Sequence, residues 1–207
     1  GHTHIVEVKG YTDLRVVGRT RDDAAGEAFD KAARAMGMPY PGGVEMDRIA
    51  EEGNPEAFRL PHPKVDGAPY DFSFSGLKTA VINLIHNAKQ KGEELPIPDL
   101  AASFRKAVVD CLVQNFVKAA QESGAKKLVI AGGVSANSLL RRRLEEECSR
   151  SGWNLYKPAL NLCGDNAAMV GAQGYYEYLA GHTAGLDLNA CAEMPIQGPQ
   201  AQQNPRR

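Results

Sequence analysis

The sequence lacks the features of membrane and secreted proteins. It contains no secretion signal and no run of about 18 apolar residues, the shortest stretch expected of a membrane-spanning helix. Its four cysteines form no CxxC pair and follow no regular spacing. Cys111 and Cys148 fall on apolar helix faces and are predicted to be small buried hydrophobic residues. We therefore expect a cytoplasmic protein with reduced thiols and no membrane partner.

The sequence also lacks histidine pairs at metal-binding spacings and a large net charge. None of the five histidines belongs to a His-x-x-x-His or HExxH pattern, the spacings typical of metal sites on helices. This absence counts strongly against a metallopeptidase. The formal net charge of −1 gives no overall attraction for nucleic acid, so any such contact must be local. The clusters Lys126-Lys127 and Arg141-Arg142-Arg143 are most simply explained as solvated surface charge.

What is present predicts a mixed α/β protein. With 207 residues and 43% hydrophobic content, the chain can bury one sizeable core or two small lobes. His2 and His4 share one face of the first predicted strand, either as a metal pair or as two ordinary strand histidines. Periodicity and turn residues predict a hairpin over 3–20, helices over 23–36, 44–53, 76–89 and 99–123, strands over 126–131 and 154–158, and a last helix opened by Gly164 and Asp165. The inner face of that last helix is predicted to hold Ala168, Met169, Ala172, Tyr176 and Leu179.

The stretch KKLVIAGGVSAN, residues 126–137, predicts a short buried strand, a glycine turn and a capped helix. Gly132 and Gly133 let backbone N–H groups approach a ligand closely, and the helix start beyond them is electropositive. Phosphate or a nucleotide is the natural guest of such a turn. A plain connection between strand and helix remains the alternative.

The helix over 23–36 carries an unusual polar face. Its buried stripe is predicted to hold Ala25, Phe29, Ala32 and Met36, while Asp23, Gly26, Glu27, Asp30 and Arg34 share the opposite face. A glycine within a helix costs about 1 kcal/mol relative to alanine. A ligand lying against Gly26 would explain that cost, and a plain solvent-facing surface is the alternative.

Several motifs together resemble one known family. They are Gly1-His2-Thr3, DDAAGEAFDK at 22–31, Pro41-Gly42-Gly43, FSFSGLKT at 72–79 and CGDNAAM at 163–169. In this order they are similar to the tRNA N6-adenosine threonylcarbamoyltransferases, once labelled O-sialoglycoprotein endopeptidases, of the actin-like/sugar-kinase ATPase superfamily. The resemblance covers residues 1–196 and only the C-terminal half of the family, or somewhat more.

The resemblance implies an α/β fold, the C-terminal lobe of an actin-like (ASKHA) ATPase with a helical insertion, lacking the N-terminal lobe. We expect a hairpin and first helix at 1–43, a helical insertion at 44–124, the remainder of the α/β lobe at 125–196 and a disordered tail at 197–207. The middle strand of the family's sheet precedes the Gly1-His2-Thr3 turn, so the hairpin and the strand over 128–131 are expected to flank a vacant position.

The resemblance also implies site residues. Asp30 would contact the nucleotide or its threonylcarbamoyl adduct, Gly43 would add a backbone contact, and Gly132, Gly133 and Asn137 would line the adenosine pocket. Gly1 belongs to the turn that borders the phosphates in the family. Phe72 and Phe74 are predicted packing anchors, and Lys78 either meets phosphate or tRNA or lies along the surface.

Asp165 has two interpretations. From the residues alone it is a helix N-cap, and by resemblance it is the third ligand of an iron or zinc ion. The family's other two ligands form a His-x-x-x-His pair that this chain lacks. The chain is therefore not expected to build that metal site alone.

By resemblance, the chain is a fragment of the enzyme that transfers a threonylcarbamoyl group from threonylcarbamoyl-adenylate to N6 of adenosine 37 in tRNAs reading ANN codons. We expect it to be inactive alone, with tRNA and accessory subunits as partners and with possible self-association through an exposed sheet edge. One alternative is a non-catalytic nucleotide-binding or scaffold partner in the same complex. A metallopeptidase is the other.

Overall fold

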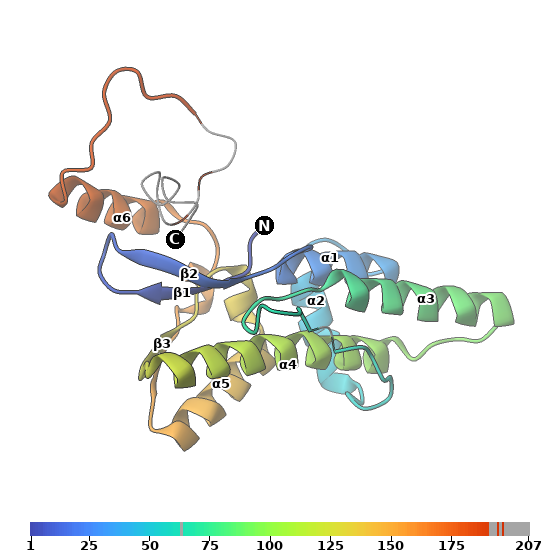
Figure 1. Cartoon of the computed structure of the whole chain (residues 1–207). Coiled ribbons are helices and arrows are strands. Elements are labelled where there is room, and N and C mark those ends of the chain that lie inside the picture. The colour runs from blue at the N-terminus through green and yellow to red at the C-terminus, as the bar shows by residue number, and fades with distance from the viewer. Residues whose placement is uncertain (63, 191–193, 195, 197–207) are drawn as a thin grey trace.

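The computed structural model describes residues 1–62, 64–190, 194 and 196, so the predicted disordered tail at 197–207 lies outside the described residues. The chain begins with the predicted antiparallel hairpin, in which β1 (His4–Val8) pairs with β2 (Leu14–Arg19). Helices dominate the rest of the fold (Figure 1). They are α1 (Ala25–Ala35), α2 (Gly42–Ile49), α3 (Ser75–Lys91), α4 (Ile97–Ser123), α5 (Ser138–Ser151) and α6 (Ala167–Leu179), with short 3-10 turns η1 (Ala50–Glu52), η2 (Gly133–Ala136) and η3 (Leu160–Leu162).

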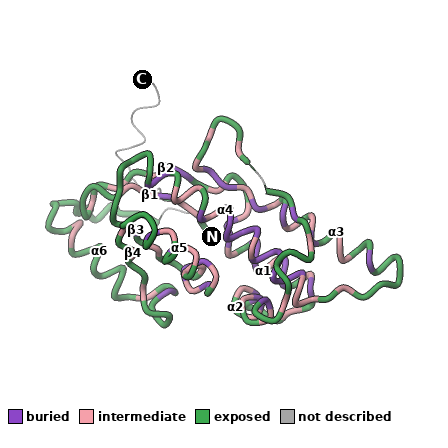
Figure 2. Tube along the Cα trace, turned by 90° about the horizontal axis from the view of Figure 1, so that it is seen from below, coloured by how far each residue is buried: buried purple, intermediate pink, exposed green. Residues whose placement is uncertain are grey.

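The main hydrophobic core lies between α1, α2, α3 and α4, and Figure 2 shows the buried segments gathered along α1 and α4. Phe29 of α1 meets Phe104 of α4 edge to face, with ring centroids 5.6 Å apart. The predicted anchors Phe72 and Phe74 are fully buried in the same core. Ile5 of β1 joins this core too, so the hairpin and the helices fold around one apolar centre. The predicted domain boundaries at 43, 124 and 196 stay predictions.

Helix α4 connects the core to the second half of the chain. It starts within two residues of the predicted Asp99 and ends before Gly124, whose positive φ of 71° favours glycine. Its predicted buried residues Leu100, Phe104 and Val108 are fully enclosed. Val109 and Val113, from another face of the helix, pack against Leu140 and Leu144 of α5. Because α4 is apolar on more than one side, it can pack against both halves of the chain.

A second, parallel pair of strands lies beyond α4. β3 (Lys127–Val129) pairs with β4 (Asn154–Tyr156), and α5 forms the crossover between them. Leu128 is buried against Ala120 and Cys148, which confirms that Cys148 is a small buried hydrophobic residue. Cys111 is buried as well, in the main core.

The prediction for α6 is wrong in two respects. Asn166, not Asp165, is the N-cap, because the Asn166 side chain accepts a hydrogen bond from the Met169 N–H. The predicted inner face is exposed, with Met169 and Leu179 51% and 61% accessible. Figure 1 shows α6 standing beyond the hairpin, where Tyr176 stacks on Tyr11 of the β-turn. The apolar spacing predicted a helix correctly. On the face that it marks, Tyr176 is partly covered by Tyr11, while the other predicted inner residues are exposed.

The two strand pairs do not form one sheet in the described part of the chain. β1 pairs with β2 and β3 pairs with β4, which leaves one edge of β1 and one edge of β3 open. An isolated bridge from Thr20 to Phe72 covers the end of β2. No helix among the described residues has both the length and the apolar character needed to cross a membrane.

Candidate functional site

The glycine turn leads from β3 into η2 and then into α5. Gly132 has a φ of +84°, a conformation that side-chain-bearing residues rarely adopt, so glycine is required there. Ser135 and Asn137 follow and are both buried. The Asn137 side chain caps α5, because its Oδ1 accepts the Leu140 N–H at 3.0 Å. The predicted strand, glycine turn and capped helix are therefore confirmed. The prediction that the strand is buried is wrong, because only Leu128 of β3 is buried and its neighbours Lys127 and Val129 are exposed.

The N-terminus of α5 is not open to a phosphate as the sequence predicted. Asp47 of α2 accepts the Ser138 N–H through Oδ2 at 2.9 Å and the Asn137 amide Nδ2–H through Oδ1 at 2.9 Å. A carboxylate thus already sits where the helix dipole favours negative charge. Phosphate bound at this helix start would meet the Asp47 charge. The glycine turn remains available to an uncharged part of a ligand, such as a nucleoside.

Arg105 of α4 is a buried side chain that donates hydrogen bonds to Asp47. Only 6% of the Arg105 side chain is exposed, and its Nη1 donates to the Asp47 carboxylate at 2.9 Å and to the Asp47 carbonyl at 3.0 Å. The same nitrogen donates to Glu51, and this hydrogen bond lowers the pKa of Glu51. Removing one member of such a buried group would leave the opposite charge unpaired. We call Asp47, Glu51, Arg105, Asn137 and Ser138 the interhelix cluster.

Asp30 holds the start of α2. Its Oδ1 accepts the N–H groups of Gly42 and Gly43 at 2.9 and 3.2 Å, so two residues predicted for the nucleotide site, Asp30 and Gly43, are in direct contact. A carboxylate at a helix N-terminus is stabilised by the helix dipole. A Cβ atom on Gly42 would collide with Ala33, so this glycine lets α1 and α2 approach closely. The Asp30 carboxylate therefore already accepts two hydrogen bonds from the chain itself.

Gly26 faces a protein side chain in this structure. A Cβ atom at this position would lie 3.4 Å from Cγ2 of Val134 in η2. A Cβ atom there would make an ordinary van der Waals contact, so packing of α1 on η2 does not by itself require glycine at this position. That a ligand lies against Gly26 stays a prediction. The face of α1 that carries Gly26 and Asp30 is thus covered by two segments, η2 and the start of α2.

The first residues of the chain lie against the start of α1. Thr3 accepts the Ala25 N–H through Oγ1 at 2.9 Å, so it acts as the cap that the helix otherwise lacks. A Cβ atom on Gly1 would be 3.6 Å from Cβ of Ala24. The predicted site residues are therefore placed along α1 and η2, with Gly1 at one end and the Asp30–Gly43 contact at the other.

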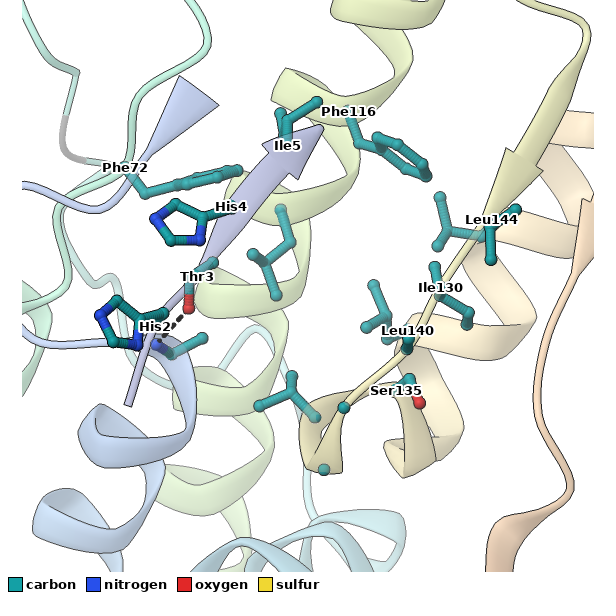
Figure 3. A pocket seen from close by; sticks show the side chains of 17 residues that line it. His2, Thr3, His4, Ile5, Phe72, Phe116, Ile130, Ser135, Leu140 and Leu144 are labelled. Atoms are coloured by element: carbon teal, nitrogen blue, oxygen red, sulfur yellow. Dashed lines mark hydrogen bonds between the residues drawn. The ribbon is translucent and has the colours of Figure 1, made fainter. Parts of the chain in front are cut away.

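A cavity of about 220 Å³ lies between β1 and β3, and Figure 3 shows its lining. His4 and Ile5 come from β1, and His2 and Thr3 from the segment just before it. Ile130, Leu140 and Leu144 lie opposite them. Gly132 and Gly133 line the same cavity. The imidazoles of His2 and His4 stack with centroids 5.4 Å apart, as expected for neighbours on one strand face. Burial lowers the pKa of His4, and the charges of His2 and Arg19 add to the effect.

The residues present do not fit a transition-metal site. Asp165 is exposed, and the described residues contain no group of three or more His, Cys, Asp or Glu side chains that could hold a metal ion. A single aspartate binds such an ion poorly.

The acidic pair that opens the DDAAGEAFDK motif is structural. Asp22 accepts the Phe74 N–H at 2.8 Å and the Ser73 hydroxyl at 2.5 Å, which fixes the start of α3. Asp23 forms ion pairs with Lys31 and with Lys78 of the FSFSGLKT motif, at 2.8 and 2.9 Å. Lys78 is therefore engaged within the chain.

The roles of Asp47 and Arg105 were not predicted from the sequence. Asp47 lies in VEMDRIAEEG, which resembles an ordinary surface helix. Arg105 carried the better signal, since it interrupts the apolar run of α4 directly after Phe104. A charged residue within the most buried part of a helix indicates a buried partner.

Comparison with known proteins identifies the family of the chain. Residues 1–172 match the family described as tRNA N6-adenosine threonylcarbamoyltransferase, TsaD. The chain belongs to this family. The relative from Clostridium botulinum (strain Kyoto / Type A2), which carries the family's name, is 48% identical over 196 residues. The relative from Bacillus cereus is 51% identical over 198 residues, and the one from Moorella thermoacetica is 48% identical over 196.

The chain spans little more than half of these relatives. The match covers 95% of this chain and 58% of the Clostridium botulinum protein, and 95% and 57% for the Bacillus cereus protein. Among solved structures, full-length HypF in its phosphate- and nucleotide-bound form matches with a TM-score of 0.55 and 22% identity, over 77% of this chain and 25% of HypF. This likeness concerns the fold alone. Together with the family it confirms the predicted α/β lobe of an actin-like ATPase.

Proposed function

We propose that the chain is the C-terminal part of an enzyme that transfers a threonylcarbamoyl group from threonylcarbamoyl-adenylate to N6 of an adenosine in tRNA. The observation that carries the proposal is the match of residues 1–172 to the family of that name. The specific acceptor is adenosine 37 of tRNAs reading ANN codons. The proposal includes accessory subunits as partners and a cytoplasmic location, as expected of an enzyme that acts on tRNA.

In the proposed reaction, the N6 amine of the adenosine attacks the carbamoyl carbonyl carbon. A new C–N bond forms, the bond from that carbon to the phosphate oxygen breaks, AMP leaves, and the amine loses a proton. The chain's contribution is to hold the adenylate, because orientation of two reactants supplies a large part of the rate. Gly132, Gly133 and Asn137 bind the adenosine part, Asp30 and Gly43 complete the site, and Gly1 borders the phosphates.

The complete enzyme is proposed to contain one divalent metal, iron or zinc, with Asp165 as one ligand. The residues of this chain do not fit such a site by themselves, so no step is assigned to the metal here. A non-catalytic role in the same complex is the second candidate. The intact contact between Asp30, Gly42 and Gly43 supports the first candidate, because it preserves part of the predicted nucleotide site.

The function is tested with a hybrid protein. The 196 matched residues of the Clostridium botulinum relative are replaced by those of this chain, which restores the full length of the family. The hybrid is assayed for threonylcarbamoyl transfer to tRNA by nucleoside mass analysis. Transfer by the hybrid supports the proposal. A folded hybrid that binds adenine nucleotide but transfers nothing favours the non-catalytic role.

Asn137→Ala in the same hybrid tests the nucleotide site. We expect adenine nucleotide binding to weaken by about 1–3 kcal/mol, because a polar contact in a buried site is lost. Isothermal titration calorimetry measures the change. Equal affinities for the hybrid and its Asn137→Ala variant would remove Asn137 from the site. The 207-residue chain alone is expected to bind the nucleotide weakly or not at all.

Self-association through sheet edges is also proposed for the chain. The open edges of β1 and β3 are the supporting observation, because unpaired strand edges readily pair with another chain.

A further inference from the structure

We propose that Asp47 is a positioning residue, which fixes the side chain of Asn137 and thereby the nucleotide-binding turn. The inference rests on the proposed function, in which Asn137 contacts the adenosine. It concerns the last turns of α2, whose role in the site was not predicted from the sequence.

Two hydrogen bonds fix the side-chain amide of Asn137. Its Oδ1 accepts the Leu140 N–H at 3.0 Å, and its Nδ2 donates to Asp47 Oδ1 at 2.9 Å. These two bonds determine which end of the amide is oxygen and which is nitrogen. Oδ1 is occupied by the Leu140 N–H, and one of the two N–H groups of Nδ2 is occupied by Asp47. The second N–H of Nδ2 can therefore donate a hydrogen bond to a ligand. Asp47 therefore sets the chemical character of the contact.

The side chain of Asp47 is itself held firmly. Arg105 donates to both the carboxylate and the carbonyl of Asp47, and Ser138 donates its N–H and its hydroxyl to the carboxylate. Because several donors bind the Asp47 carboxylate, it is held in a single orientation. A side chain that is fixed in this way can transmit its position to a neighbour.

Helix α2 connects two parts of the proposed site. Asp30 fixes the first turn of this helix through Gly42 and Gly43, and Asp47 near its last turn fixes Asn137 and Ser138. Two parts of the proposed site, the Gly43 backbone and Asn137, are thus attached to the ends of one eight-residue helix. The helix acts as a spacer of fixed length, because a helix resists stretching.

The experiment compares Asp47→Ala with Glu45→Ala in the hybrid protein that contains the 196 matched residues of this chain. Glu45 lies on the same helix, carries the same charge and pairs only with Arg48 among the described ion pairs, so it is a matched control. Nuclear magnetic resonance titration with AMP measures the affinity. We expect Asp47→Ala to weaken AMP binding at least tenfold and Glu45→Ala to change it less than twofold. Asp47→Ala combined with Asn137→Ala should bind no more weakly than Asn137→Ala alone.

The side-chain amide of Asn137 provides a readout that does not depend on AMP. Its Nδ2 protons should exchange slowly with solvent in the unmodified hybrid and in Glu45→Ala, and fast in Asp47→Ala. If Asp47→Ala does not fold, Asp47→Asn replaces it, and intermediate exchange is expected because one oxygen acceptor remains. Failure of the unmodified hybrid to bind AMP would count against the proposed function, while the amide would still decide the role of Asp47.

Two results would overturn the inference. One is an unchanged Asn137 amide in a folded Asp47→Ala hybrid. The other is a double variant whose loss of AMP affinity equals the combined losses of the two single variants, since independent effects add.

Discussion

At the scale of single residues, Ser135 is a buried polar group without a partner. Its side chain is 2% exposed, and its hydroxyl has no hydrogen-bond partner among the described residues. We expect Ser135→Ala to leave the free energy of unfolding unchanged or to raise it by up to about 1 kcal/mol, because an unpaired buried hydroxyl is costly. Urea denaturation measures the change.

Ser103→Ala is the matched control. Ser103 is equally buried, but its hydroxyl accepts the Phe58 N–H at 3.1 Å. Its replacement should lower the free energy of unfolding by about 1 kcal/mol. A loss of similar size in Ser135→Ala would show that the Ser135 hydroxyl has a partner, such as a buried water molecule.

Asp23 should make stability depend on pH. Hydrogen bonds from Lys31 and Lys78 lower its pKa against the opposing effect of burial. A lowered pKa in the folded state means that the unfolded chain binds protons first. The contribution of Asp23 is therefore complete above a pH of about 4, and is lost as the pH falls through the lowered value.

We expect Asp23→Asn to lower the free energy of unfolding at pH 7 by about 1 kcal/mol or less, since Lys31 is partly exposed. The difference from the unmodified chain should disappear at acidic pH. Denaturation between pH 2 and 7 measures both curves. Curves that stay parallel over this range would contradict the role of Asp23.

The roles of single residues were only partly predictable from the sequence. Asn137 as a helix cap follows from its place before an apolar helical pattern. Asp47 was missed because its partners, Asn137 and Ser138, are about ninety residues away along the chain. Local patterns contain no information about such contacts. The functional roles of Asp30, Gly43 and Asn137 came from the family resemblance, and they stay predictions.

At the scale of elements, the contact of α1 with α2 depends on one glycine. A Cβ atom on Gly42 would collide with Ala33. We expect Gly42→Ala to lower the free energy of unfolding by about 1–3 kcal/mol, because overpacking forces the two helices apart. Thermal and urea denaturation measure the effect.

Gly76→Ala serves as the control for that substitution. Gly76 lies in the first turn of α3, and a Cβ atom there would meet nothing within 4 Å. The substitution should leave the stability unchanged or increase it by about 0.4–1 kcal/mol through the unfolded chain. Equal effects of the two substitutions would mean that α1 and α2 can separate without cost.

Helices were predicted well where the core decides their pattern. The stripe of α1, from Ala25 to Met36, is buried as its spacing required. The stripe of α6 has similar spacing but is exposed. Periodicity shows which face of a helix is apolar, and it says nothing about whether another element covers that face. The partner of α6 therefore could not be predicted from its own residues.

At the scale of the whole molecule, the two halves meet through α4 and the interhelix cluster. The main core lies on one side of α4, and the packing against α5 lies on another. The sheet contributes little to this junction, since β1–β2 and β3–β4 stay separate with a cavity of about 220 Å³ between them. The sequence predicted this separation only through the family, in which a middle strand occupies the position.

The open edges lead to a prediction about association. Each unpaired backbone group that becomes buried costs about 1–3 kcal/mol, against a typical net stability of about 5–15 kcal/mol. We therefore expect the chain either to self-associate through these edges or to keep residues 1–20 mobile. Light scattering measures the first outcome, and hydrogen exchange across residues 3–20 measures the second. A strict monomer with strongly protected amides over residues 3–20 would contradict both.

A substitution on β3 tests whether association uses the edge. Val129 is 61% exposed and lines the cavity, so Val129→Lys should be tolerated by the fold. A lysine on an open edge discourages pairing with another strand. We expect Val129→Lys to shift the chain toward the monomer at concentrations where the unmodified chain associates. Val44→Lys, at a 72% exposed position on α2, is the control, because it adds the same charge away from the edge. Equal suppression by both variants would mean that added charge, and not the strand edge, controls association.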